Sequence, residues 1–69
     1  MYHYTKVLLD ELKHLRNIGG TPEWAGMIIA SDYLRKMGTT ERGEACPLIK
    51  SEWPEAFGAI AKQFPERIV

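Results

Sequence analysis

The chain has 69 residues, of which 45% are hydrophobic, and its nine lysines and arginines balance nine aspartates and glutamates. This length predicts a single domain over residues 1–69, near the lower limit for folding around one core, and the apolar fraction is too high for a disordered chain. A net charge of zero leaves no strongly basic footprint, and no apolar run approaches the ~20 residues that a membrane-spanning helix needs.

The first expected helix covers about residues 4–18. Its apolar residues recur at the spacing of an amphipathic helix, basic residues gather near its end, and two glycines follow it. The apolar stripe contains Tyr4, Val7, Leu8, Leu12, Leu15 and Ile18. Leu9 lies off this stripe. Glu11 falls within it, so we expect its carboxylate at the exposed margin, in a pair inside the chain, or against a partner.

The second expected helix covers residues 22–37. Thr21 is a good N-cap, Pro22 suits the first turn, and Gly38 ends the segment. The broad apolar side contains Met27, Ile29, Ala30, Tyr33, Leu34 and Met37. Gly26 lies on the same side and would let another backbone approach closely; Gly58 in the third helix is interpreted as a packing position too.

Residues 38–50 are expected to form a long ordered connector, since glycines punctuate this stretch and Pro47 disfavours a helix through it. A short helical turn would fit within the connector, whose Leu48 and Ile49 are expected to fold onto the core. The third helix is expected over about residues 52–64, beginning near Ser51. Its apolar residues are Trp53, Ala56, Phe57, Ile60, Ala61 and Phe64.

Together these segments predict an all-α fold, a compact bundle of three principal helices. The core is expected to contain Leu8, Leu12, Leu15, Ile29, Tyr33, Leu34, Phe57, Ile60 and Phe64. A chain this small has apolar side chains left over after its core is assigned, which favours a homodimer slightly.

Trp24 and Ile28 are the most unusual feature, because they share the polar face of the second helix with Ser31, Asp32 and Arg35. Tryptophan and arginine are enriched among the residues that anchor protein interfaces. The expected partner-binding residues are Trp24, Ile28, Arg35 and Leu9. The competing interpretation is that the connector or the Ile68-Val69 tail covers the Trp24 and Ile28 side chains.

Few residues suggest chemistry. Asp10 and His14 lie four apart on one helix face, where a carboxylate can orient a histidine base, but a solvated pair is the simpler interpretation. His3, His14 and Cys46 fall short of a four-ligand zinc set unless carboxylates join. We therefore expect no catalytic residue, no metal site, no cofactor and no enzymatic activity.

Cys46 is the only cysteine, so the chain cannot form an internal disulfide. Its near neighbours Glu44 and Ala45 do not activate a thiol, which predicts a structural cysteine. An unpaired cysteine fits a reducing compartment, and the cytoplasm is therefore the expected location.

The function expected from these features is non-enzymatic protein binding by a small inhibitor, adaptor or regulator that occupies a surface of a larger protein. The alternative is a dimeric helix-turn-helix-type DNA-binding regulator whose second helix reads the DNA. That helix would present only two basic residues, Arg35 and Lys36, although a DNA-binding module normally neutralises several phosphates.

Overall fold

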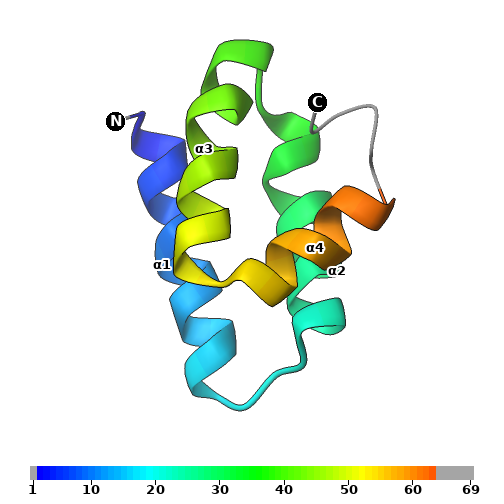
Figure 1. Cartoon of the computed structure of the whole chain (residues 1–69). Helices are drawn as coiled ribbons and strands as arrows, with labels where there is room; N and C mark the ends of the chain where they lie inside the picture. Colours follow the sequence, from blue (N-terminus) through cyan, green and yellow to red (C-terminus); the bar gives the residue numbers. More distant parts are fainter. Residues whose placement is uncertain (1, 64–69) are drawn as a thin grey trace.

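The computed structural model describes residues 2–63, which form four α-helices and one 3-10 turn without a strand (Figure 1). The elements are α1 (His3–Asn17), α2 (Pro22–Asp32), η1 (Leu34–Lys36), α3 (Thr39–Glu52) and α4 (Pro54–Gln63). The helices α1 and α3 lie side by side, and α4 crosses α2 (Figure 1). The all-α prediction is confirmed, but the bundle has four helices within residues 2–63 rather than three.

The additional helix is α3, which replaces the predicted connector. Pro47 lies inside it on the exposed side. A proline ring displaces the carbonyl four residues earlier, here that of Gly43, and the lost hydrogen bond and the clash cost about 3 kcal/mol. Three side chains of the helix are buried, namely Ala45, Cys46 and Ile49. The prediction of a connector was wrong because the burial of these side chains offsets the local cost of Pro47 in the helix.

The second helix ends earlier than predicted, at Asp32, and the 3-10 turn η1 follows it. Residues from two other elements bind the carbonyls at this end. The Tyr4 hydroxyl donates to the carbonyl of Asp32 at 2.9 Å, and the Arg42 guanidinium donates to the carbonyl of Leu34 at 3.4 Å. The Tyr4 hydroxyl satisfies a carbonyl at the end of the helix. Arg42 is a second donor to the Leu34 carbonyl, which also accepts from the N–H of Met37. The chain can therefore leave the helix without a glycine.

The last helix begins later than predicted. Ser51 and Glu52, expected in its first turn, complete α3 instead, and α4 begins at Pro54. Trp53 separates the two helices in a non-helical conformation, with φ −151° and ψ 85°. A proline disfavours the helical conformation in the residue before it, and Pro54 itself occupies the first helical position, where a missing N–H costs nothing.

The core draws on every element. Its buried members are Leu8, Leu12, Leu15, Ala25, Ile29, Leu34, Met37, Ala45, Ile49, Trp53, Ala56 and Ile60. All the aliphatic residues predicted for the core are confirmed. The aromatic ones differ: Tyr33 and Phe57 are partly buried against the core, and Phe64 lies outside the described residues. Trp53 is the aromatic side chain that belongs to the buried core instead, at 9% exposure.

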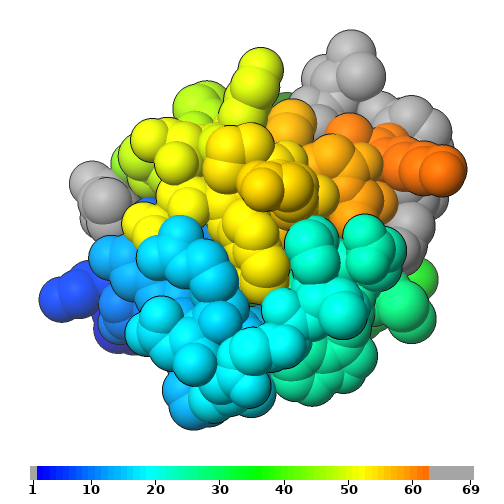
Figure 2. Space-filling view, turned by 60° about the horizontal axis from the view of Figure 1, so that its bottom comes forward, coloured from blue at the N-terminus to red at the C-terminus, as the bar shows by residue number. Residues whose placement is uncertain are grey.

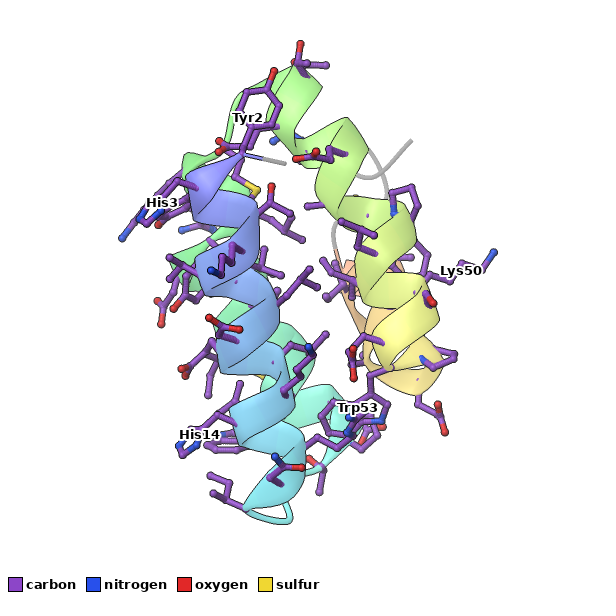
Figure 3. The ribbon with its side chains drawn as sticks, turned by 90° about the vertical axis from the view of Figure 1, so that its left-hand side faces the viewer. Tyr2, His3, His14, Lys50 and Trp53 are labelled. Carbon is purple, nitrogen blue, oxygen red and sulfur yellow. The ribbon has the colours of Figure 1, made fainter. Side chains whose placement is uncertain are left out.

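The ends of α1 and α3 are joined by Arg16. Its guanidinium donates to the carbonyl of Glu52 at 2.6 Å and pairs with the Glu52 carboxylate at 2.7 Å. Lys13 lies 3.9 Å from the same carboxylate. Trp53 sits next to this junction, between the C-terminal ends of α1 and α3 (Figure 3). The junction therefore holds together the end of the molecule that carries the turn from α1 to α2.

Candidate functional site

The helix α2 buries Ile29 and three small residues, and it exposes two large apolar side chains. Its buried residues are Ala25, Gly26, Ile29 and Ala30. Trp24 and Met27, in contrast, are 43% and 54% exposed. They are three residues apart in the helix, so their side chains lie on one outward side. The small residues let α4 come close at Gly26, and Trp24 and Met27 remain on the surface.

Trp24 is held in place by the turn that precedes its helix. Its backbone N–H donates to the hydroxyl of Thr21 at 3.1 Å, which confirms Thr21 as the N-cap. Its ring lies against Gly20 so closely that a Cβ at that position would overlap the ring. Ile18, just before the two glycines, is 57% exposed. In Figure 2 the turn and the first residues of α2 lie side by side on one face of the molecule.

The structure separates the four predicted partner-binding residues. Trp24 and Arg35 are exposed, whereas Leu9 and Ile28 are partly buried and pack against the core. Arg35 lies in η1, beyond the opposite end of α2 from Trp24. A helix of this length spans about 16 Å, so Arg35 is not a neighbour of the tryptophan. Only Trp24 lies in the exposed apolar surface described above.

Met27 and Ile18 are exposed residues that sequence reasoning assigned to the apolar stripes of their helices. On α1 the buried row is Thr5, Leu8, Leu12 and Leu15, so the true stripe is rotated away from Ile18. Thr5 is fully buried and was missed because threonine is counted as polar. On α2 apolar residues occur all round the helix, and their pattern therefore does not reveal which side faces out.

An open groove lies where α2 meets α4. It is lined by Glu23, Glu55, Gly58, Ala59 and Lys62. Below it the two helices are in close contact at Gly26, whose Cβ, if present, would lie 3.1 Å from Cβ of Ala59. This confirms the close approach predicted at Gly26. Gly58 differs from its prediction as a packing position: it is exposed, and a Cβ there would meet nothing within 4 Å.

The residues considered for chemistry lie apart. His3 and His14 point outward from α1, toward opposite ends of that helix (Figure 3). Asp10 and His14 are both exposed. Cys46 is a buried free thiol in α3, and burial raises its pKa, with a smaller opposing effect from the charge of Arg42. Across residues 2–63, no group of three or more histidine, cysteine or carboxylate side chains is arranged to hold a metal ion.

Glu11 lies partly exposed at the edge of the core, the first of the three arrangements expected for it. Its charge acts on Tyr33, whose pKa is raised mainly by burial and further by the nearby Glu11 carboxylate. The Tyr33 ring packs against that of Tyr4, with ring centroids 5.4 Å apart. These groups hold α1 to the end of α2 and have a structural role.

No protein-family model matches this chain, and neither a curated protein nor a solved structure is significantly similar to it. None of the helices formed by residues 2–63 combines the length and apolar character needed to cross a bilayer.

Proposed function

We propose that the protein is a non-enzymatic protein-binding module, a small inhibitor, adaptor or regulator that occupies a surface of a larger protein. The contact surface is the α2 patch, which we define as Trp24 and Met27 together with Ile18 on the adjoining turn. One observation carries the proposal: the large apolar side chains of Trp24 and Met27 are 43% and 54% exposed, on a helix that buries Ile29 together with small residues.

The composition of the α2 patch supports a protein partner. Single exposed apolar residues are ordinary, but tryptophan and methionine are enriched in the buried centres of protein interfaces. Trp24 is also preorganised, because its ring rests against Gly20 and loses little freedom on binding. A partner with an apolar pocket for the exposed part of this ring fits the patch.

The DNA-binding alternative finds less support. The helix that would read the DNA, α2, contains the acidic residues Glu23 and Asp32 and no lysine or arginine. Arg35 and Lys36 lie in η1, after the helix has ended. Phosphate contacts from this helix would therefore meet acidic rather than basic side chains.

We further propose that the protein acts in the cytoplasm. Its single cysteine, Cys46, is a free thiol. A reducing compartment keeps such a thiol from forming disulfides with other proteins when the chain opens transiently.

The test is affinity capture from a nuclease-treated cell lysate with the wild-type chain and two patch variants, Trp24→Ala and Met27→Lys, as baits. The lysine at position 27 lies four residues after Glu23, a spacing that supports the helix while removing the apolar surface. Loss of an anchoring residue costs about 2 kcal/mol, so each variant should retain its partner with roughly thirtyfold lower affinity.

The matched control is Lys50→Glu, an exposed change on α3 away from the patch (Figure 3). It should capture the same protein as the wild type, and thermal melts should show that all baits are folded. Equal capture by the patch variants and the wild type would contradict the proposed surface. Recovery of nucleic acid alone from an untreated lysate would favour the DNA-binding alternative.

A further inference from the structure

The exposed face of α4 is unusual because small residues lie at its centre and opposite charges at its ends. Gly58 and Ala59 are central, Glu55 lies three residues before Gly58, and Lys62 lies three residues after Ala59. These spacings put all four residues on one side of the helix. The glycine, its neighbour and both charged residues line the open groove that Glu23 of α2 bounds.

Packing inside the chain does not explain Gly58. A glycine inside a helix is less favourable than alanine by about 1 kcal/mol, yet a Cβ at Gly58 would meet nothing within 4 Å. Gly43 of α3 is similarly open, but its carbonyl is the one that the ring of Pro47 crowds. This gives a local reason for a glycine at position 43. Gly58 has no proline four residues after it in the sequence.

We propose that this face binds a second copy of the chain, with the two α4 helices packed antiparallel across a twofold axis. Turning the helix around an axis between Gly58 and Ala59 brings Glu55 of each copy opposite Lys62 of the other. Gly58 then lies close to the axis, beside Ala59, which also packs against Gly26 of α2, and the absence of bulk lets the backbones approach to the lower end of the ~8–10 Å helix separation. Such an interface is self-complementary in shape and charge.

Charge complementarity is what identifies the occupant. Each α4 face supplies one carboxylate and one ammonium group at equal distances from the axis, so a copy of the same face satisfies both. Glu23, on the wall of the groove, is a second carboxylate, so each copy brings two carboxylates and one ammonium group to the groove, and the excess negative charge opposes the pairing and weakens the dimer. Because α4 has only 10 residues, the buried area is smaller than the ~800 Å² per partner of a stable complex, and the dimer is weak.

A charge-swap series tests the dimer by sedimentation equilibrium of the full chain from micromolar to millimolar concentration. The wild-type mass should rise from 7.9 kDa toward twice that value as concentration increases. Glu55→Lys and Lys62→Glu each place like charges opposite one another at two sites, so each should weaken self-association about tenfold or more. An equimolar mixture of these two variants should associate again, because one supplies two lysines and the other two glutamates.

Two further variants distinguish effects on self-association from effects on the stability of the monomer. Lys50→Glu makes the same charge change in the last turn of α3 and should leave the dimer unaffected. Gly58→Leu has room within its own chain and should raise the melting temperature of the monomer, while its bulk blocks the second copy.

A mass of 7.9 kDa at every concentration would overturn the proposal, as would a mixture of the two charge variants that fails to associate. These changes lie on α4 and the capture variants lie on α2, so either proposal can fail while the other holds.

Discussion

Glu44 connects the beginning of α1 to α3 through a charged hydrogen bond. The backbone N–H of Tyr2 donates to its carboxylate at 3.0 Å. This bond stabilises the ionised form and lowers the pKa of Glu44 below its usual value of 4.5, and desolvation opposes the effect. The residue holds together elements that are far apart in the sequence.

Because the pKa of Glu44 is lower in the folded chain than in the unfolded one, its ionised form stabilises the fold above about pH 4.5. That contribution is lost as the pH falls through the lowered pKa. Glu44→Gln should therefore reduce the free energy of unfolding at neutral pH and match the wild type in strong acid. Denaturant titrations over a pH series measure this difference.

The control for the pH series is Glu41→Gln, which removes another carboxylate from the same helix. It should not reproduce the pH-dependent loss. A difference between wild type and Glu44→Gln that stays constant into strong acid would show that the hydrogen bond does not depend on ionisation of this carboxylate.

At the scale of the helices, the α2–α4 crossing contains two glycines with opposite roles. A Cβ at Gly26 would lie 3.1 Å from Cβ of Ala59 and 3.3 Å from the carbonyl oxygen of Ala56, so an added methyl must push the helices apart. Gly58, on the outer side of α4, has free space around it. The same substitution should therefore have opposite effects at the two positions.

Gly26→Ala should lower the free energy of unfolding by about 1–2 kcal/mol, since the strain of overpacking exceeds the gain in helix propensity. Gly58→Ala should raise it by roughly 0.5–1 kcal/mol. Denaturant titrations at a concentration where the chain is monomeric give both values. A stabilised Gly26→Ala variant would contradict the close contact of α2 with α4.

The sequence predicts the helices with clear periodicity best. The aliphatic core of α1, the N-cap at Thr21 and the close approach at Gly26 were all found from residue type and spacing. Helix α3 was missed because only three of its side chains are buried, so Pro47 dominated the local signal. Burial against other helices supplies the compensating free energy, and a local pattern does not show it.

The candidate surface was predicted only at Trp24. A helical wheel puts Trp24 beside Ser31, and Trp24 is 43% exposed, but Ile28, assigned to the same polar side, is partly buried against the core. Met27 was placed on the wrong side, because α2 is apolar all round and its orientation depends on which residues are small enough for the crossing with α4. Arg35 is exposed but does not belong to the α2 patch, because α2 ends at Asp32 and Arg35 lies in η1.

At the scale of the whole molecule, the four helices support two separate surfaces. The α2 patch lies where the turn from α1 enters α2, and the α4 face lies along the groove beside it. Arg16 and Trp53 brace the end of the molecule that carries this turn, so the patch is presented on a fixed support. The core takes Trp53 and the aliphatic side chains, whereas Trp24 and Met27 stay exposed and are left for a partner.

The most direct test of protein binding by the α2 patch is photocrosslinking in living cells. The photoreactive residue p-benzoylphenylalanine replaces Met27 in one variant and Lys50 in another, both at exposed positions. We predict a discrete crosslinked product with one larger protein from position 27 and none from position 50. Equal labelling from both positions, or none from position 27, would contradict a protein-binding role for the α2 patch.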